Sequence, residues 1–406
     1  MSNDIQPEIR FPGFTDEWEQ VKLKDVATVF DGTHQTPKYT ESGVKFVSVE
    51  NIKTLETEKY ISQEAYDSEY SKKQAEKGDV LMTRIGDIGT AKVIETDEPL
   101  AYYVTLALLK PNEIDSSFLA WLISSPEVQR NIWKRTLHIA FPKKINLGEI
   151  NQIEMNVPSL EEQQKIGTFF KQLDDTIALH QRKLDLLKET KKGFLQKMFP
   201  KNGAKVPEIR FPGFTEDWEQ RKLGEVVERV TRKNKKLESI RPLTISAQEG
   251  LIDQNEFFNK TVASRDVSGY YLVKKGEFAY NKSYSNGYPW GAVKRLNQYD
   301  MGVLSTLYIV FKPKKIDSDF LEKYYDTTYW YKEVSKHAAE GARNHGLLNI
   351  AASDFFETEI VMPLKIEEQQ KIGAFFKQLD DTIALHQREL DVLKETKKGF
   401  LQKMFV

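Results

Sequence analysis

The chain of 406 residues contains no cysteine, so it can form neither a disulfide framework nor a thiolate zinc site. This absence is typical of proteins from a reducing compartment, and we expect a cytoplasmic protein. No apolar run approaches the roughly 20 residues that span a bilayer. The first residues also lack the basic and apolar parts of a signal peptide. We therefore expect no membrane partner.

The motifs of common enzyme classes are also missing. The sequence has no Gly-Lys dipeptide, and hence no phosphate-binding loop of that type. It has no Gly-x-Gly-x-x-Gly, no Gly-x-Ser-x-Gly and no His-Glu-x-x-His. Asp185, Glu189 and Lys191 resemble a nuclease pattern, but they fall in a segment with coiled-coil periodicity. We therefore expect no catalytic residue, no metal site and no cofactor on this chain.

Neither sign of charge is in excess, because 59 Lys and Arg residues face 60 Asp and Glu residues. Hydrophobic residues make up 40% and charged residues 29%, which is ordinary for a folded protein. A small DNA-binding domain is usually more basic. Any nucleic-acid role must therefore rest on local basic patches, or on a partner that supplies phosphate contacts.

What the sequence does contain is an internal duplication. The lead-in at 7–23 returns at 207–223 with 14 of 17 positions identical, and the segment 161–199 returns at 367–405 with 36 of 39 identical. The stretches between them, 24–160 and 224–366, have largely diverged. Because long near-identical segments bracket them, we interpret the chain as two copies of one domain fold with diverged working surfaces.

The repeated segments show apolar residues at alternating spacings of 4 and 3, which predicts a long helix with a coiled-coil seam. Ser159 and Glu162 suggest an N-terminal capping box, and Pro200 ends the first helix. Leu179 and Leu186 would widen the seam. The central seam positions are Leu173, Ile177, His180, Leu184 and Leu187 in the first copy and Leu379, Ile383, His386, Leu390 and Leu393 in the second.

Each predicted helix needs an apolar partner, and the other copy in the same chain is the simplest one. Antiparallel packing would put two equivalent domains at opposite ends, related by a pseudo-two-fold axis; pairing between chains is the alternative. A full antiparallel overlap would bring His180 close to His386. We interpret these histidines as residues that set the register rather than as metal ligands.

The two diverged stretches mix strand-like runs with helices, which predicts α/β domains. In the first, 44–49, 80–85 and 106–110 resemble strands, and 116–135 resembles one or two helices with Trp121 and Trp133 in the core. In the second, the matching strands are 241–247, 277–282 and 307–312, and the matching helix is 318–337. Traces of similarity remain between 110–119 and 312–321 and between 78–84 and 276–282.

Polar and basic loops separate these elements, and DNA recognition uses such residues, cations for phosphates and forked or amide donors for base edges. A solvated surface is the alternative interpretation of such runs, and loop packing is the alternative for the aromatic residues at 281–291. The candidate DNA-binding residues are Thr33, His34, Gln35, Lys38, Arg84, Lys143 and Lys144 in the first domain and Arg232, Lys233, Asn234, Lys235, Asn281, Lys282, Tyr284, Asn286, Arg343 and Asn344 in the second.

The repeated motif LEEQQKI…FFKQLDDTIALHQRKLDLLKETKKGFLQKMF, the lead-in ending FTDEWEQVKL and the opening DGTHQTPKY resemble the DNA-specificity subunit of type I restriction–modification systems. The resemblance implies two target-recognition domains, at 1–158 and 207–364. It also implies two spacer helices, at 159–199 and 365–406, packed as an antiparallel coiled coil. Residues 200–206 form the linker between the halves.

The resemblance further implies a non-catalytic subunit that reads a bipartite, asymmetric site on double-stranded DNA. Two methyltransferase subunits that methylate adenine, and restriction subunits that cleave, would be its partners. S-adenosylmethionine, ATP and Mg²⁺ would then bind those partners. A helix of about 50 Å corresponds to roughly 15 base pairs, so its length could set the gap between half-sites.

Two alternatives remain open at this point. The chain could be a non-catalytic scaffold whose variable domains bind proteins, or a nuclease or methyltransferase in its own right. DNA binding with a steep salt dependence would distinguish DNA recognition from the scaffold. Activity of the isolated subunit would support the enzyme.

Overall fold

The computed structural model describes residues 6–201, 203–246, 249–260, 263–264, 266–283, 287–337, 348 and 350–406. The chain divides into two compact units, each formed by segments from both halves of the sequence. The first unit contains residues Met1–Arg182 and Gln387–Val406, and the second contains Lys183–His386. Each unit therefore combines one α/β domain with parts of both long helices, α6 (Leu160–Lys197) and α12 (Ile366–Lys403).

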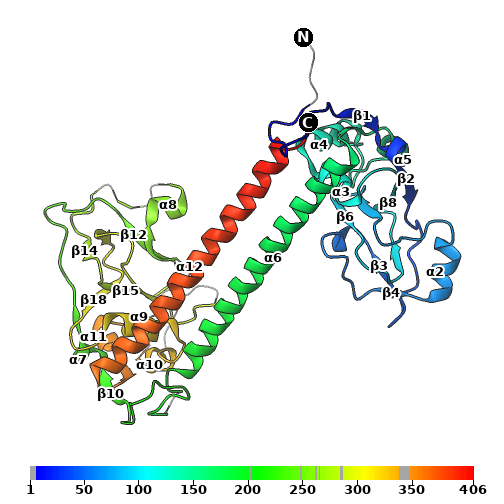
Figure 1. Cartoon of the computed structure of the whole chain (residues 1–406). Helices are drawn as coiled ribbons and strands as arrows, with labels where there is room; N and C mark the ends of the chain where they lie inside the picture. Colours follow the sequence, from blue (N-terminus) through cyan, green and yellow to red (C-terminus); the bar gives the residue numbers. More distant parts are fainter. Residues whose placement is uncertain are drawn as a thin grey trace. The chain divides into compact units, whose positions relative to one another are not determined.

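The first α/β domain is built on a four-stranded antiparallel sheet in the order β2-β8-β5-β6, beside a three-stranded sheet in the order β4-β3-β7 (Figure 1). A two-stranded sheet pairs β1 with β9, which brings the lead-in to the end of the domain. The strands are β1 (Glu19–Lys22), β2 (Ala27–Asp31), β3 (Val44–Val47), β4 (Tyr60–Ile61), β5 (Val80–Thr83), β6 (Ala91–Val93), β7 (Leu100–Tyr102), β8 (Leu106–Pro111) and β9 (Glu154–Val157). The helices are α1 (Leu23–Val26), η1 (Val49–Asn51), α2 (Gln63–Tyr70), α3 (Ser116–Ser124), α4 (Pro126–Arg135) and α5 (Leu147–Asn151).

The second α/β domain repeats the main sheet in the order β11-β18-β15-β16, and β10 with β19 repeats the two-stranded sheet. Two further pairs, β12-β13 and β14-β17, differ from the first domain. The strands are β10 (Glu219–Lys222), β11 (Val227–Arg229), β12 (Leu243–Ser246), β13 (Gly250–Asp253), β14 (Tyr271–Lys274), β15 (Phe278–Asn281), β16 (Ala292–Arg295), β17 (Met301–Leu304), β18 (Ile309–Pro313) and β19 (Glu359–Met362). The helices are α7 (Leu223–Val226), α8 (Gln254–Phe258), α9 (Ser318–Asp326), α10 (Tyr331–His337) and α11 (Ala352–Glu357).

The central strands of each main sheet, β5 with β8 and β15 with β18, are largely buried on both faces, which explains their continuous apolar runs. Side chains alternate along a strand, so Val80 and Met82 of β5 join one core while Leu81 between them joins another. In the second domain Phe278 and Tyr280 join one core and Ala279 joins the other. The predicted α/β class is therefore present in both domains.

The long helices run antiparallel within each unit. In the first unit Phe169 of α6 packs edge-on against Phe400 of α12, and Asp174 accepts a hydrogen bond from Lys397 at 2.5 Å. In the second unit Phe194 packs edge-on against Phe375, and Lys191 lies 2.6 Å from Asp380. In both units the residue numbers of the contacting positions rise along α6 as they fall along α12. The two helices therefore run in opposite directions.

The repeated lead-in holds the start of each long helix through a buried ion pair. Arg10 donates to both carboxylate oxygens of Glu162 at 2.8 Å, and Arg210 contacts Glu368 in the same way at 2.7 and 2.8 Å. Both glutamates are fully buried. Glu162, expected in a capping box with Ser159, is thus the partner of Arg10. This contact explains why the lead-in and the helix motif are repeated together.

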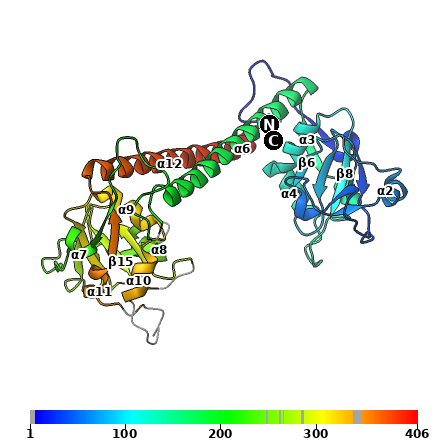
Figure 2. The ribbon, with the colours of Figure 1, turned by 90° about the horizontal axis from the view of Figure 1, so that it is seen from below.

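The first turns of α6 pack closely against the start of α3. The Gln163 side chain accepts a hydrogen bond from the Asp115 backbone amide at 3.0 Å, and Asp115 caps α3. Gly167 is required here, because a Cβ atom would lie 2.7 Å from the Asp115 carboxylate and 3.0 Å from the Phe118 nitrogen. Figure 2 shows the equivalent helix α9 against α12. There the Asp317 amide donates to Gln369 and Asp317 caps α9, while a Cβ atom on Gly373 would lie 2.9 Å from the Phe320 nitrogen.

The residual similarity between 110–119 and 312–321 now has a physical cause. These segments form the capped starts of α3 and α9, and each must fit the same repeated helix surface. Trp18 packs edge-on against Phe118 and Phe405, so the residues that follow α12 complete the core of the first unit. In the second unit Trp218 contacts Phe320 and Phe199 equivalently.

Two expectations about apolar residues are wrong. Trp133, expected in the core, is 59% exposed, because α4 buries the face that carries Val128 and Ile132. Leu179 and Leu186 do not widen the seam, since they are 59% and 68% exposed. Trp121 is partly buried and packs against the first core, as expected. Among the described residues, no helix is long and apolar enough to cross a membrane.

Candidate nucleic-acid interface

Arg84 joins the three polar loops of the first domain. It follows β5, is only 6% exposed, and its guanidinium pairs with Asp31 at the end of β2. Its Nε also donates to the carbonyl oxygen of Ile145 at 3.2 Å. Asp31 accepts a second hydrogen bond from His34 at 2.7 Å. The loops at 31–40, 83–90 and 137–145 therefore form one surface, and Arg84 lies beneath it.

The loop after Asp31 combines a fixed base with exposed side chains. The Thr33 backbone exchanges hydrogen bonds with the strand-end residues Tyr102 and Val104 at 3.1 and 2.9 Å. Gly32 allows this approach, because a Cβ there would lie 2.3 Å from the Tyr103 carbonyl oxygen. Thr33 itself is buried. The exposed residues that follow are His34, Gln35 and Lys38.

The loop at 137–145 is held at its base and exposed at its tip. Lys144 forms isolated β-bridges with Leu137 and with Ile85. The backbone carbonyl of Lys143 accepts a hydrogen bond from Gly86 at 2.9 Å. The side chains of Lys143 and Lys144 are exposed, and the ammonium group of Lys143 lies 5.3 Å from the centre of the Trp133 ring. Both lysines can therefore reach a ligand from a fixed backbone.

The second domain has a half-buried cation, Lys282, at the equivalent position. Lys282 follows β15 as Arg84 follows β5, and its ammonium group donates to the carbonyl oxygen of Ile350 at 3.3 Å. Ile350 corresponds to Ile145, since both precede by nine residues the paired strands β19 and β9. Asn281 accepts a hydrogen bond from the Ser283 amide at 3.0 Å, so its side chain also shapes the loop.

The basic segment at 229–241 is more structural than its composition indicates. Arg232 pairs with Glu277, and Lys233 donates to the Gly269 carbonyl while lying 4.0 Å from the centre of the Tyr271 ring. Asn234 is fully buried and donates to the Ser239 carbonyl at 2.7 Å. Lys235 is exposed. The candidates Tyr284, Asn286, Arg343 and Asn344 lie outside the described residues.

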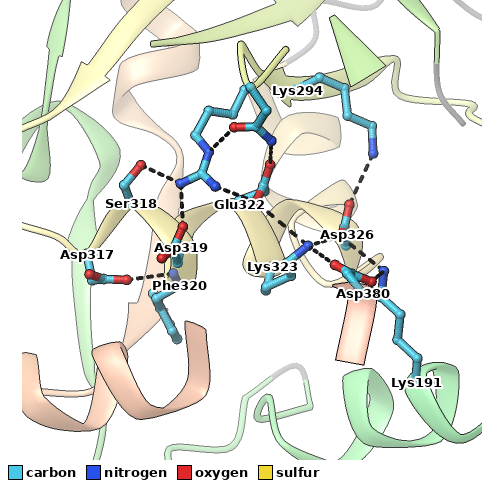
Figure 3. Close-up of polar contacts among 12 residues, drawn as sticks. Lys191, Lys294, Asp317, Ser318, Asp319, Phe320, Glu322, Lys323, Asp326 and Asp380 are labelled. Carbon is cyan, nitrogen blue, oxygen red and sulfur yellow. Dashed lines mark hydrogen bonds and ion pairs between the residues drawn. The ribbon is translucent and has the colours of Figure 1, made fainter. Parts of the chain in front are cut away.

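A charged cluster joins the second domain to the long helices, as Figure 3 shows. Lys323 of α9 donates to Asp380 of α12 at 2.6 Å and to Asp326 at 3.2 Å, and it is almost fully buried. Asp326 also accepts from Lys294 at 3.1 Å. Burial raises the pKa of Asp326, but the neighbouring ammonium groups of Lys294, Lys323 and Lys191 outweigh this effect and lower it.

The first unit has no such cluster at the equivalent position within its described residues. Trp121 stands where the second domain has Lys323, and Ser124 stands where it has Asp326. The ammonium group of Lys397, which pairs with Asp174, lies 4.3 Å from the centre of the Trp121 ring. The two domains therefore contact equivalent helix surfaces with different chemistry, one through a ring and the other through ion pairs.

The seam positions named from the periodicity are buried or half-buried, and Leu184 and Leu390 are almost fully buried. Within the first unit, Nδ1 of His180 lies 3.6 Å from a carboxylate oxygen of Glu389. The approach of His180 to His386 stays a prediction, because His386 belongs to the second unit. Among the described residues, neither unit contains by itself three clustered metal-ligating side chains.

The model of the type I restriction modification DNA specificity domain matches this chain twice, at residues 15–189 and 215–395. The two matches together cover most of the sequence. The chain belongs to this family. Each match contains one α/β domain and most of the long helix that follows it, so the duplication seen in the sequence is a duplication of the specificity domain.

Two relatives of the specificity-domain family come from Methanocaldococcus jannaschii. One is named the putative type I restriction enzyme MjaX specificity subunit, and it is 27% identical over 52% of this chain and 52% of its own length. The other, the type I restriction enzyme MjaVIII specificity subunit, is 27% identical over 61% of this chain and 60% of its own. The matched region thus spans about half to three fifths of these relatives.

Solved structures of type I restriction–modification proteins share the fold. The S subunit from M. genitalium has a TM-score of 0.61 at 14% identity, over 99% of both chains. A chain from a study of complex assembly and conformational transition of the type I system has a TM-score of 0.52 at 15% identity, over 97% of this chain and 98% of that chain. At these identities the likeness concerns the fold alone.

Sequence reasoning missed the residues that organise the surface. Asp31, Ile145 and Trp133 position the loops, yet none was a candidate. Arg84, the common partner of Asp31 and Ile145, lies far from both in the sequence, so no local spacing reveals these contacts. One signal was available: Trp133 is one residue past Ile132, and so lies about 100° around the helix from the buried face.

Proposed function

We propose that this chain is the DNA-reading subunit of a type I restriction–modification complex. Each variable domain reads one half of an asymmetric, bipartite site and directs adenine methylation and DNA cleavage by partner subunits. The observation that carries the proposal is a contrast within the chain. Equivalent contacts join both domains to the long helices, whereas the loops around Arg84 and Lys282 differ. Two different DNA-reading surfaces, held by equivalent contacts to the long helices, match a DNA target whose two half-sites differ.

In this proposal α6 and α12 form an antiparallel coiled coil with pseudo-two-fold symmetry, and their length separates the half-sites. The support comes from equivalent contacts inside the two units. Lys397 pairs with Asp174 in the first unit, and Lys191 pairs with Asp380 in the second. These residues exchange places under the 206-residue offset of the repeat. The proposal takes the recognition domains as 1–158 and 207–364, the spacer helices as 159–199 and 365–406, and the linker as 200–206.

The chain acts without catalysis of its own and binds no cofactor. Two methyltransferase subunits carry S-adenosylmethionine, and restriction subunits carry ATP and Mg²⁺. Equivalent apolar residues on the long helices support two equivalent partners. Leu179 and Val392 are 59% and 65% exposed in the first unit, and Leu385 and Leu186 are 48% and 68% exposed in the second.

Exposure divides the candidate residues into two proposed groups. His34, Gln35, Lys38, Lys143, Lys144 and Lys235 are exposed and are proposed as direct contacts. Buried or paired candidates are proposed as positioning residues that shape the surface: Thr33, Arg84, Arg232, Lys233, Asn234, Asn281 and Lys282. This division follows from access, because a side chain committed to the protein has few donors left for phosphates or bases.

Sequencing that detects modified adenines tests this function. The chain is expressed with its methyltransferase subunits, and we expect one bipartite, non-palindromic motif. Replacing the loop at 31–40 should change one half of the motif and leave the other unchanged. The proposal would be contradicted if no modified motif depended on the presence of this chain. It would also be contradicted if the motif stayed the same after the loop replacement.

A scaffold whose variable domains bind proteins is the second candidate, since exposed apolar residues also occur in protein interfaces. DNA binding by the assembled complex separates the two. A DNA reader that neutralises several phosphates loses affinity steeply as salt rises, with a slope of about 0.9 per phosphate contact on a logarithmic scale. A scaffold would show no sequence-dependent DNA binding.

A further inference from the structure

The loop at 137–145 presents two apolar side chains that contact almost nothing in the protein. Ile139 is 99% exposed and Phe141 is 103% exposed, and they stand two residues apart at the tip. Apolar side chains are normally buried, and full burial of one stabilises a protein by about 1.5–3 kcal/mol. Two such side chains at one loop tip therefore indicate a surface that is covered when the protein acts.

The tip is presented by a firmly held base. Leu137 donates its backbone amide to the carbonyl of Lys144 at 2.8 Å, and the same loop bridges to Ile85. Below the tip, the His138 ring lies 3.8 Å from the Trp133 ring, and its Nε2 is 2.9 Å from the Trp133 carbonyl oxygen. The tip thus has a defined place beside the Arg84 surface.

The charge around the tip identifies its partner. Residues 136–148 contain Lys143, Lys144 and His138 but no acidic residue, and Glu149 is paired with Arg135. An apolar tip flanked by exposed cations complements the DNA duplex, which offers stacked bases between two lines of phosphates. A protein interface is usually depleted in lysine at its apolar centre. DNA is therefore the partner that matches both features.

We propose that Ile139 and Phe141 form an apolar wedge that enters the DNA duplex between neighbouring base pairs of the half-site read by the first domain. Lys143 and Lys144 then contact the flanking phosphates. This inference rests on the proposed function and adds a mechanical role to it. Enzymes that methylate a base in duplex DNA must extrude that base, which costs a few kcal/mol of stacking and pairing. A wedge that opens the stack lowers that cost for the partner methyltransferase.

The test uses the complex of this chain with its methyltransferase subunits and the DNA motif found by sequencing modified adenines. 2-Aminopurine, whose fluorescence rises when it is unstacked, replaces single bases of the first half-site. We expect the wild-type complex to raise this fluorescence. Phe141→Ala should lower DNA affinity by between about 5- and 140-fold, the range for losing one base–aromatic stack, and abolish the rise. Ile139→Ala should act in the same direction.

Two further variants separate the effect of the aromatic ring from the effect of charge. Phe141→Trp keeps a ring that can stack and should retain affinity and the fluorescence rise. Lys143→Gln should reduce the salt dependence of binding by about one phosphate contact and keep the rise. All variants should melt as the wild type does, because the altered side chains are exposed.

Three outcomes would overturn the wedge. Phe141→Ala and Ile139→Ala could bind with wild-type affinity and an unchanged fluorescence rise. Wild-type binding could leave 2-aminopurine stacked at every position of the first half-site. Phe141→Ala could instead weaken assembly with the methyltransferase subunits, which would identify a protein contact. A wild-type complex that shows no sequence-specific DNA binding would refute the proposed function itself, before any variant is measured.

Discussion

Arg84 and Lys282 occupy the same place in the two domains, although the residues around them differ. Each ends the central strand of its main sheet and donates to the carbonyl oxygen of an equivalent isoleucine. Arg84 is buried and Lys282 is half-buried, and a cation that donates to the protein has fewer donors left for base recognition. These two residues therefore support the loops, and the exposed residues above them carry the contacts proposed with DNA.

Replacing Arg84 by Met should destabilise the first domain by about 1–3 kcal/mol. The change removes one partner of a largely buried pair, and Asp31 is left with partial access to water. Arg84→Lys should be milder, since Lys282 makes the equivalent carbonyl contact. Thermal unfolding measures the loss. Lys143→Gln is the control and should change stability by less than about 0.5 kcal/mol. If Arg84→Met melted as the wild type does, the positioning role would be wrong.

For the candidate residues, the local sequence predicts exposure on a loop but not contacts with distant parts of the fold. The exposure of polar residues such as Gln35 and Lys38 can be predicted from the sequence, because polar loops lie on surfaces. The contacts of Arg84 and Asn234 within the protein cannot be predicted in this way, since their partners are set by the fold. The exposure of Phe141 cannot be predicted either, because nothing in its neighbourhood distinguishes an exposed phenylalanine from a buried one.

At the scale of elements, the surfaces where α3 and α9 contact the long helices explain which parts of the diverged domains stay alike. Both helices begin with a capping aspartate, and the backbone of the first turn of each lies against a glycine of the repeated helix. One turn further, Trp121 and Lys323 differ completely. The helix start is constrained by close backbone approach, whereas the next turn can use either an aromatic ring or an ion-pair cluster.

Gly167→Ala should destabilise the first unit by about 1–3 kcal/mol, because the added methyl group would overlap the backbone and cap of α3. Gly193 lies in the same helix and is the matched control. A Cβ at that position meets nothing within 4 Å, so Gly193→Ala should stabilise by about 0.5–1 kcal/mol through helix propensity. Thermal unfolding of both variants measures the two changes in stability. Equal effects of the two substitutions would refute the close-contact role.

The ion-pair cluster should make the second unit more sensitive to acid. The pKa of Asp326 is lowered in the folded protein, so its contribution is present above the ordinary aspartate pKa of about 3.9 and is lost as the pH falls toward the folded value. Burial acts to lower the pKa of Lys323, but Asp326, Glu322 and Asp380 outweigh it, and the net shift is upward. That contribution is complete below a pH of about 10.4 and is lost only in stronger base.

Asp326→Asn tests this dependence. The variant should lose about 3 kcal/mol near neutral pH, because a buried partner of three lysines is neutralised. Its stability should then fall less than that of the wild type between pH 5 and pH 3. Melting temperatures across this range measure both effects. Asp67→Asn, at an exposed position of the first domain, is the control and should follow the wild type. Parallel curves for Asp326→Asn and the wild type would contradict the assignment.

At the scale of the whole molecule, the sequence alone predicts the duplication, the long helices and the α/β class, because repeat identity and heptad spacing are direct signals. Which segments of the chain form each compact unit could not be predicted in the same way. Phe405, at the end of the second helix, completes the core around Trp18 near the start of the chain. This contact depends on how the folded chain brings its two ends together, and the periodicity of a helix does not predict that.

Shortening both long helices by one heptad tests the proposed spacer. Deleting seven residues within Lys171–Lys188, and the equivalent seven from the second copy, keeps every seam position on its face. If the helices set the gap between half-sites, a loss of about 10 Å should shorten that gap by about three base pairs, or abolish modification if the partners cannot follow. Sequencing of modified adenines measures the gap, and circular dichroism verifies that both domains remain folded. A shortened chain that directs modification of the identical site at the original rate would show that helix length does not set the spacing.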